Sequence, residues 1–333
     1  TSPSIHFIFF FPHYIFMPIG KIATFDEGSI NGSIEYSTLL KSTKVSSENR
    51  ELLYTFYAEK KPVKAYIVII TETRDLTTKW RLWLNNFSLT KEFKPIDTVR
   101  VGGSYYNLNI YDVTHLTREG KNEFVVSHSS IEGIWVHIIN SVLFYEVPEF
   151  KTNYKLRAGI YLIQPSEEIE LDGEGKNYVV VRNPNKSILR VVNSTGTVTT
   201  IGGSLDSDEI EVKGHLSIIH ESSQRSPAFL FLHYSENSIT PSISINVNGK
   251  IGKDNKAVIT LYNDGEVDLD RVLLNVMLNG VTIHFKSFDN MKIGQKINYE
   301  FFVPKKGNVH LRIVGVKSGF RKILDKDLEW ETA

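Results

Sequence analysis

The feature that most restricts how this chain can fold is an apolar stretch near its amino terminus, from Ile5 to Ile19. The stretch reads IHFIFFFPHYIFMPI and contains no acidic residue, no lysine and no arginine, but two prolines, Pro12 and Pro18. Each Å² of apolar surface left in water costs roughly 25 cal/mol. The stretch must therefore be covered by something.

Four arrangements could cover this stretch. A transmembrane helix needs about 20 apolar residues, whereas this run is shorter and each proline would break a helical hydrogen bond. A signal-peptide remnant would follow a basic segment, whereas Lys21 comes after the run. The two arrangements that fit better are a first strand in the protein's own core and a strand donated to a neighbouring subunit. The sequence leaves both open.

The pattern of side chains favours an extended strand that is buried on both faces. Continuous apolar sequence is typical of such a strand, because a half-exposed strand alternates apolar and polar residues. Pro12 cannot donate a hydrogen bond to a β-ladder, so we expect a break or a bulge there. We predict a possible donor strand within an N-terminal segment of residues 1–32, formed by Ile5, Phe7, Ile8, Phe9, Phe10, Phe11, Tyr14, Ile15 and Phe16.

The composition predicts an ordinary globular protein. Its 333 residues are enough for two or three domains. A hydrophobic content of 41% and a charged content of 23% are typical of folded proteins. The formal net charge is zero and the pI is about 7.1, so we expect no nucleic-acid partner and no attraction to an anionic membrane surface. No other apolar stretch reaches the length of a membrane span, so we expect none.

The chain contains no cysteine. This excludes disulfides, thiol nucleophiles and thiolate metal sites, and a chain of this size can be stable outside the cell through its cores alone. The tripeptide Asn-x-Ser/Thr is a weak signal by itself, but it becomes meaningful in a secreted β protein. The candidate N-glycosylation sites are Asn31, Asn86, Asn185 and Asn193.

Short segments rich in β-branched and aromatic residues recur from residue 33 onward. Residues 63–71 and 229–233 are examples, and residues 134–139 and 142–146 are expected to form two separate strands. Many short strands with few helical periods predict an all-β protein made of tandem β-sandwich domains. We place these domains at 33–150 (jelly-roll-like), 151–240 (a second β-sandwich) and 241–333 (immunoglobulin-like).

Part of the first domain resembles a known family. The sequences VKAYIVI, WRLWLNN, YDVTHLTREGKNEFVV and VLFYE follow one another between residues 63 and 146. They are similar to jelly-roll modules of the galactose-binding-like type, and look closest to a family of archaeal cell-surface domains of uncharacterised function. The resemblance covers about a third of the chain and implies a fold without any attached chemistry. It also implies that Asp112 and Thr114 fix a turn, because short polar side chains bond nearby backbone amides.

The last domain resembles a second family. The sequence ITLYNDGEVDLD, followed by VLLNVMLNG, is similar to the adhesion-related immunoglobulin-like repeat of the CARDB type in bacteria and archaea. Asn263 and Gly265 match the characteristic turn at a strand end in that repeat. The resemblance implies a spacer or stalk in a surface protein.

Acidic residues form two clusters that could attract a cation. Calcium prefers clustered oxygen ligands, but we interpret both clusters as solvated turns and expect no metal and no other cofactor. The chain contains no G-x-S-x-G, no H-E-x-x-H and no phosphate-binding glycine loop before a helix, so we predict no enzyme activity. One cluster comprises Asp264, Glu266, Asp268 and Asp270, and it is the better calcium candidate. The other comprises Asp206, Asp208, Glu209 and Glu211.

Together these features predict a structural subunit of an extracellular surface assembly, either a filament or pilus or a surface layer. Donation of the N-terminal apolar strand would join the subunits, and the partners would be copies of the chain itself, other surface-layer proteins and possibly glycans. The alternative is a carbohydrate-binding surface adhesin with a self-inserted N-terminal strand. In that case Trp83, Trp135 or Tyr106 would stack on sugar, although tryptophans on alternating strands, including Trp80, are more often core residues.

Overall fold

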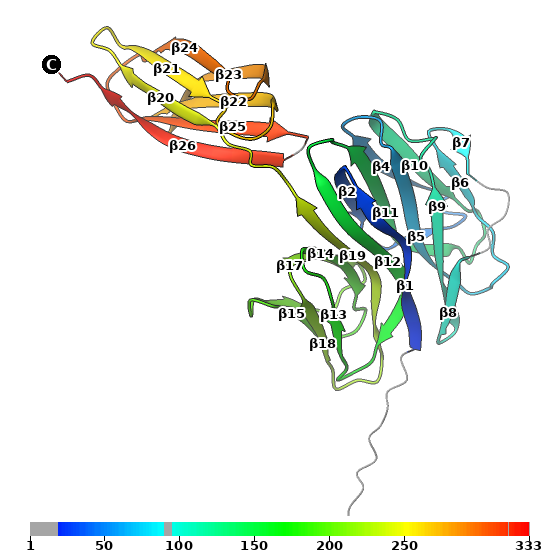
Figure 1. The fold of residues 1–333 in the computed structure, drawn as a ribbon. Helices are drawn as coiled ribbons and strands as arrows, with labels where there is room; N and C mark the ends of the chain where they lie inside the picture. The colour runs from blue at the N-terminus through cyan, green and yellow to red at the C-terminus, as the bar shows by residue number, and fades with distance from the viewer. Residues whose placement is uncertain (1–18, 90–94, 319, 333) are drawn as a thin grey trace, which may run out of the picture. The chain divides into compact units, whose positions relative to one another are not determined.

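The structure is a computed structural model that describes residues 19–89, 95–318 and 320–332 (Figure 1). Within these residues the regular elements are β-strands and no helix is found. The prediction of an all-β protein built from sandwich layers is confirmed. The residues predicted to form the donor strand, Ile5 to Phe16, lie outside the described part of the chain.

The chain divides into two compact units. The first contains residues up to Glu146 and Thr152–Asn237, and the second contains Val147–Lys151 and Ser238 onward. The stretches 33–150 and 151–240 therefore lie mainly in the first unit, and the stretch 241–333 lies in the second.

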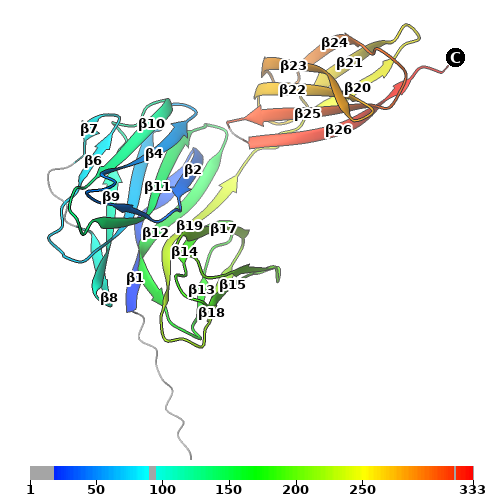
Figure 2. The same ribbon diagram turned by 180° about the vertical axis from the view of Figure 1, so that it is seen from behind.

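The described residues of the first unit form nineteen strands in four sheets, seen from two sides in Figures 1 and 2. The strands are β1 (Ile19–Ile30), β2 (Gly32–Leu39), β3 (Thr43–Val45), β4 (Glu51–Ala58), β5 (Lys64–Thr73), β6 (Arg81–Leu84), β7 (Phe87–Ser88), β8 (Asp97–Val101), β9 (Ser104–Asp112), β10 (Gly120–Ser127), β11 (Ile134–Glu146), β12 (Lys151–Ile163), β13 (Glu168–Leu171), β14 (Lys176–Arg182), β15 (Ile188–Asn193), β16 (Val198–Ile201), β17 (Ser207–Lys213), β18 (Leu216–Glu221) and β19 (Ala228–Ile239).

Two central sheets enclose the main core of this unit. One has the order β1-β12-β19-β14-β17, and the other has the order β2-β11-β5-β9-β8 with β3 also paired to β11. Their facing side chains, among them Phe144 from one sheet and Phe231 from the other, form one buried cluster. An outer sheet, β13-β18-β15-β16, covers the other face of the first sheet through a second cluster, and the sheet β4-β10-β6-β7 completes the unit.

A two-stranded ribbon passes from one central sheet to the other. The ribbon consists of the consecutive strands β1 and β2 on one side and β11 and β12 on the other. The β2–β11 pair belongs to one central sheet, and the β1–β12 pair belongs to the other. The ribbon bends at Gly32, where a Cβ atom would lie only 1.7 Å from the carbonyl oxygen of Tyr145. Only glycine fits this close approach of two backbones.

Strand β11 is longer than the sequence predicts. The expected division into strands at 134–139 and 142–146 is wrong, because β11 continues through the buried polar pair Asn140 and Ser141. Asn140 accepts a hydrogen bond from the Tyr234 hydroxyl at 2.6 Å and donates one to Thr38 Oγ1 at 2.9 Å. Ser141 Oγ lies 3.0 Å from the Tyr54 hydroxyl. Both side chains are satisfied inside the sandwich, so the strand need not end there.

The turn after β9 forms as the jelly-roll resemblance implies. Asp112 Oδ1 accepts hydrogen bonds from the backbone N–H of Thr114 at 3.0 Å and from its hydroxyl at 2.6 Å. Thr114 Oγ1 in turn accepts a hydrogen bond from the backbone N–H of Ala65 at 3.1 Å. The expected turn-fixing role of both residues is confirmed.

In the part of the second unit that the structure describes, seven strands lie in the order β23-β22-β25-β26-β20-β21-β24 around one apolar core. Asn263 fixes the turn after β21: its side chain donates to the carbonyl oxygens of Val267 and Met291 and accepts from the backbone N–H of Gly265. The strands are β20 (Asn246–Ile251), β21 (Lys256–Tyr262), β22 (Leu269–Leu278), β23 (Val281–Met291), β24 (Lys296–Phe302), β25 (Val309–Lys317) and β26 (Phe320–Trp330).

Candidate functional site

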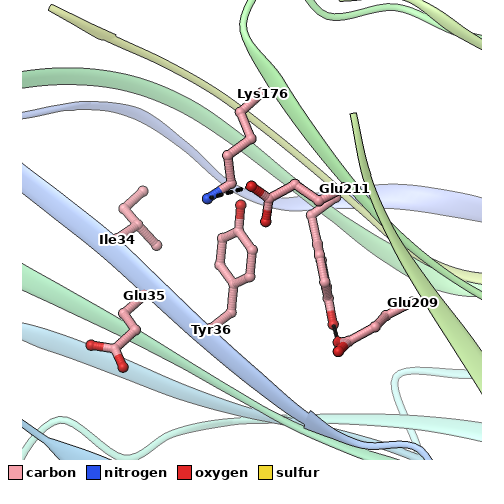
Figure 3. Close-up of a pocket in the computed structure, with 7 residues that line it drawn as sticks. Ile34, Glu35, Tyr36, Lys176, Glu209 and Glu211 are labelled. Atoms are coloured by element: carbon pink, nitrogen blue, oxygen red, sulfur yellow. Dashed lines mark hydrogen bonds and ion pairs between the residues drawn. The ribbon is translucent and has the colours of Figure 1, made fainter. Parts of the chain in front are cut away.

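The two central sheets of the first unit have an open side at strands β2 and β17. Among the described residues, β2 is laddered only to β11 and β17 only to β14, so each has a free edge. A groove of about 420 Å³ lies between these strands. We call it the β2–β17 groove; Figure 3 shows its lining residues, which are Ile34, Glu35, Tyr36, Lys176, Tyr178, Glu209 and Glu211.

The groove is closed at one end and open at the other. At the closed end the backbone N–H of Ser207 donates to the carbonyl oxygen of Leu40 at 2.9 Å. Further along β2, Thr38 Oγ1 lies 2.6 Å from the Tyr178 hydroxyl. Here a hydrogen bond between side chains, in place of one between backbones, connects the two sheets. Beyond this point no backbone bond joins the two edges in the described structure, and Ile34 and Glu211 line the groove there. The two edges therefore form a seam that is only partly closed.

The floor of the groove is aromatic and its rim is charged. The Tyr36 and Tyr178 rings lie 4.6 Å apart. Lys176 Nζ lies 5.0 Å from the Tyr36 ring centroid, 3.5 Å from Glu211 Oε1 and 3.3 Å from Glu236 Oε1. Burial, followed by the nearby charges of Glu236 and Glu211, raises the pKa of Tyr36 well above its ordinary value. The phenol is therefore protonated at physiological pH, and Figure 3 shows its hydroxyl directed toward Lys176.

The acidic side chains of the groove outnumber its one lysine. Glu209 Oε2 accepts a hydrogen bond from the Tyr178 hydroxyl at 2.6 Å. Burial raises the pKa of Glu236 despite the opposing effect of Lys176. In chemical terms the β2–β17 groove offers aromatic surface, free backbone edges and a net negative rim. Such a surface suits an extended polypeptide without acidic residues better than it suits a free anion.

A second group of residues, which we call the Glu72 cluster, lies at one end of the sheet that contains β5, β9 and β11. Trp135 is paired across β11 and β5 with Glu72, and Glu72 is paired across β5 and β9 with Tyr106. The side chains of these three residues therefore share one face. His137 stacks against the Tyr106 ring at 5.3 Å and the Trp135 ring at 6.4 Å. Trp135 is 41% exposed, whereas Tyr106 is buried.

Hydrogen bonds hold the carboxylate of Glu72 in a fixed position. His137 Nε2 lies 2.7 Å from Glu72 Oε2. Burial alone would raise the pKa of Glu72, but hydrogen bonds from His137, Ser104 and Tyr106 outweigh it, and the pKa lies below its ordinary value. Burial lowers the pKa of His137. The carboxylate is therefore ionised and the imidazole neutral at physiological pH, with Nε2–H donated to Glu72.

The second ring nitrogen of His137 connects the Glu72 cluster to the closed end of the seam. His137 Nδ1 lies 2.8 Å from Ser42 Oγ, and this hydroxyl also lies 2.9 Å from the carbonyl oxygen of Leu205. The Ser42 backbone N–H donates to Asp206 Oδ1 at 3.0 Å. A serine, a histidine and a carboxylate in this order could activate a nucleophile. Here Ser42 fastens the end of β2 to the residues before β17, which is a structural task.

Two of the predicted sugar-stacking aromatic residues are wholly or partly buried. Tyr106 is buried beneath the Glu72 cluster, where its hydroxyl accepts a hydrogen bond from Arg182 Nη1 at 3.0 Å. Trp83 is half-buried. Trp80 is buried, in agreement with its interpretation as a core residue. Trp135 alone among these four aromatic residues presents an exposed ring.

The four candidate glycosylation sites differ in how freely their amides are presented. Asn31 and Asn86 are exposed, and Asn86 lies in a tight turn. Asn193 uses its Oδ1 to accept hydrogen bonds from Thr195 and Thr197. Asn185 instead uses its Nδ2, the atom that a glycan would occupy, to donate to Pro227 O at 2.8 Å and to two further oxygens. Asn185 is therefore the least accessible of the four.

The acidic turn in the second unit does not converge on one point. Glu266 accepts a hydrogen bond from the backbone of Ser242, and Asp268 accepts one from the backbone of Ile293. Asp270 accepts one from the backbone of Ser318. Within residues 19–89, 95–318 and 320–332, no group of three or more histidine, aspartate or glutamate side chains could hold a metal ion.

Sequence reasoning did not find the β2–β17 groove. Its lining residues come from three segments that lie up to 177 positions apart, Ile34 to Glu211. The acidic cluster at residues 206–211 was the one local signal, and it supplies Glu209 and Glu211. For the Glu72 cluster, the sequence suggested only Trp135, as a possible sugar-stacking residue. Its partners Glu72 and Tyr106 come from other strands and could not be connected to it.

Comparisons with known proteins leave the family open. No family model matches the chain, and no curated protein matches it. Similar solved structures include a β-glucuronidase from Parabacteroides merdae, at 10% identity and a TM-score of 0.24, covering 52% of this chain and 27% of that chain. The glycoside hydrolase domain of Endo-D from Streptococcus pneumoniae is 11% identical with a TM-score of 0.20, covering 54% of this chain and 33% of that one.

A β-glucuronidase from Ruminococcus gnavus is 8% identical with a TM-score of 0.20, and the match covers 84% of this chain and 35% of that one. The chain thus spans roughly a third of the length of these enzymes or less. Likeness at such TM-scores carries no argument about activity. In the described part of the chain, no helix has the length and apolar character required to cross a membrane.

Proposed function

We propose that this protein is a structural subunit of an extracellular surface assembly, a filament, pilus or surface layer, whose copies are joined by donation of the N-terminal apolar strand. Its partners are further copies of the chain or other surface-layer proteins. The observation that supports donation most directly is the way in which the β1–β12 ladder ends. Ile19, the first described residue, pairs with Leu162, and β12 ends one residue later at Ile163.

Strand β12 extends only one residue beyond its pairing with Ile19. After Ile163 the chain turns at Gln164 and Pro165, where the Gln164 backbone N–H is bonded to Glu167 and proline has no N–H. Little of β12 therefore remains for pairing beyond Leu162. The phenylalanines of residues 5–16 would expose a large apolar surface in water, and a strand inserted into a neighbour supplies both backbone hydrogen bonds and apolar pockets.

An assembly joined in this way can grow by repeated addition of copies. The donor and the acceptor are different parts of the chain, so the contact is head-to-tail. Such a contact gives an open fibre or layer where the rotation between copies does not close a ring, whereas a self-complementary contact gives a closed dimer. No catalytic step is assigned to the protein.

The experiment is deletion of residues 1–18, which leaves β1 intact from Ile19. We expect the shortened protein to remain folded and monomeric by analytical ultracentrifugation, while the full chain forms large assemblies visible by electron microscopy. A length-matched control keeps all residues but replaces Phe7, Phe9, Phe10 and Phe11 with serine, and should also remain monomeric. Loss of folding in both variants would show instead that the strand inserts into its own chain.

A carbohydrate-binding adhesin is the second candidate, and the exposed ring of Trp135 favours it. An exposed tryptophan beside a fixed carboxylate, Glu72, offers a stacking face and a hydrogen-bond acceptor for sugar hydroxyls. A glycan array with the wild type and Trp135→Ala tests this function. We expect at least tenfold weaker binding by the variant, with Trp83→Ala as the matched control. Unchanged binding would eliminate Trp135 as the platform.

A further inference from the structure

We propose that the β2–β17 groove is the acceptor for the N-terminal strand of a second copy; this inference rests on the proposed function and adds the place of insertion. The occupant is residues 5–16 of the neighbouring copy. The groove lies between one edge strand of each central sheet, β2 and β17, so an added strand can bond to either of them.

The free edges supply the hydrogen-bonding groups. β2 has eight residues and β17 has seven, each laddered on one side only in the described structure. Among the backbone bonds of the described residues, one joins the two edges directly, from Ser207 N to Leu40 O. Unpaired N–H and C=O groups along an edge are a template for pairing with another strand. A strand that enters from the Ile34 end would extend one sheet and narrow the seam.

The length of the donor suits this place. Residues 5–16 number twelve and in extended form span about 40 Å at 3.3 Å per residue. The donor is therefore longer than either edge strand alone. Part of it can pair with an edge while the remainder spans the distance between copies. Pro12 would interrupt the ladder, because proline has no backbone N–H to donate. The segments on its two sides, residues 5–11 and 13–16, are each long enough to form a short paired segment.

The lining of the groove complements the donor. Ile34, Tyr36 and Tyr178 line the groove; Ile34 and Tyr178 are buried, and Tyr36 is the half-buried aromatic ring that can meet the alternating phenylalanines. Glu209 and Glu211 line the same groove, and Lys176 is already engaged by Glu211 and Glu236. The donor has no acidic residue and contains His6 and His13. An acidic rim therefore meets no like charge and can attract a protonated histidine.

The position of β1 favours a neighbour over the same chain. β1 and β17 are the two opposite edges of one sheet, with β12, β19 and β14 between them. Four strand spacings separate them by about 19 Å. A donor from the same chain would have to cross the face or end of this sheet before it could enter the groove, whereas a donor from another copy can approach the free side directly.

The absence of cysteine makes a cross-linking test clean, because the introduced thiols are the only ones. One set of chains carries His6→Cys or His13→Cys, which leaves every donor phenylalanine in place. A second set carries Glu211→Cys in the groove, or Ser287→Cys on the exposed edge strand β23 as the matched control. Each pair is mixed before assembly and oxidised, and a disulfide can form only where the Cα atoms come within about 7 Å.

We expect a disulfide-linked dimer from Glu211→Cys with at least one of the two tail variants, in at least tenfold greater yield than from Ser287→Cys. Equal or lower yield from Glu211→Cys, in mixtures that still form assemblies, would overturn the acceptor site while the proposed function stands. If the unmodified full chain forms no assemblies by ultracentrifugation, the proposed function fails and the acceptor fails with it. The two failures are therefore distinguishable.

Discussion

Lys64 Nζ lies 2.6 Å from Asp26 Oδ2, and this ion pair joins β5 of one central sheet to β1 of the other. Asp26 also accepts hydrogen bonds from the hydroxyls of Tyr66 at 2.9 Å and Tyr154 at 3.2 Å. The ammonium lies 4.9 Å from the centroid of the Phe144 ring. A bulge in β1 immediately before Asp26 directs its carboxylate toward these partners.

Removal of the Lys64 charge should destabilise the first unit. In Lys64→Met the carboxylate of Asp26, which is 14% exposed, keeps two neutral donors but loses its charged one. Hydrogen bonds to charged groups are worth about 2 kcal/mol. We expect a loss of about 2 kcal/mol in the free energy of unfolding, measured by urea titration. The double variant with Asp26→Asn should recover part of the loss, and a change below about 0.5 kcal/mol would contradict a stabilising role.

The first unit should lose stability in acid because of His233. This histidine is buried, accepts a hydrogen bond from Arg157 Nη2 at 2.8 Å and donates one to Asn177 Oδ1 at 2.8 Å. Burial, then the charges of Arg157 and Lys155, lower the pKa of His233 to about 3. The unfolded chain binds a proton near pH 6.5 and the folded chain does not, so stability is complete above pH 6.5 and falls as the pH drops toward 3.

The expected slope from His233 is about 1.4 kcal/mol per pH unit below 6.5. It is measured as the midpoint of urea unfolding between pH 7 and pH 4, for the wild type and for His233→Gln. The variant should be less stable at pH 7 but should depend less steeply on pH. Parallel curves for the two proteins would show that His233 titrates normally.

The stability of the second unit should depend on pH in the opposite direction, because of His310. Its ring nitrogens lie 2.7 Å from Asp327 Oδ1 and 2.9 Å from Asp325 Oδ1, and these hydrogen bonds raise the pKa of His310. Arg312 also faces Asp325. A raised pKa in the folded state means that the stabilisation is fully present below the unfolded value of about 6.5 and is lost as the pH rises through the folded value.

Amide hydrogen exchange of β25 and β26 measures this effect locally. In the wild type, protection of these strands should decrease between pH 6 and pH 8, after correction for the intrinsic exchange rate. In His310→Gln it should not change over this range. The effect should weaken in 0.5 M salt, because the cluster is at the surface.

Glycosylation should follow the accessibility of each asparagine amide. Expression in a glycosylating host, followed by peptide mass spectrometry, should find glycan on Asn31, Asn86 and Asn193 and little on Asn185. The Nδ2 of Asn185 is engaged with Pro227 O, whereas Oδ1 is the engaged atom of Asn193. Asn185→Gln should also destabilise the unit by about 1 kcal/mol, while Asn86→Gln should be neutral. Full occupancy of Asn185 would contradict this assignment.

Local chemistry accounts for much of the agreement between expectation and structure. The turn at Asp112 and Thr114 and the turn at Asn263 depend on side chains that bond backbone atoms two to four residues away, with one longer bond in each case. Such contacts can be recognised in a linear sequence. The error at β11 has the opposite origin, because Asn140 and Ser141 are satisfied by Tyr234, Thr38 and Tyr54, which no local pattern connects to them.

The all-β class, the positions of most strands and several turns, and the strongly apolar character of the N-terminal stretch could all be recognised in the linear sequence. These properties follow from side-chain periodicity and backbone preference over a few residues. The three-dimensional fold was needed to see that β2 and β17 face each other across a partly closed seam, that Tyr36, Lys176 and Glu211 meet in it, and that the Asn185 amide is hydrogen-bonded. Those relationships depend on which edges of which sheets are left unpaired, and pairing between distant strands is set by the packing of the whole unit.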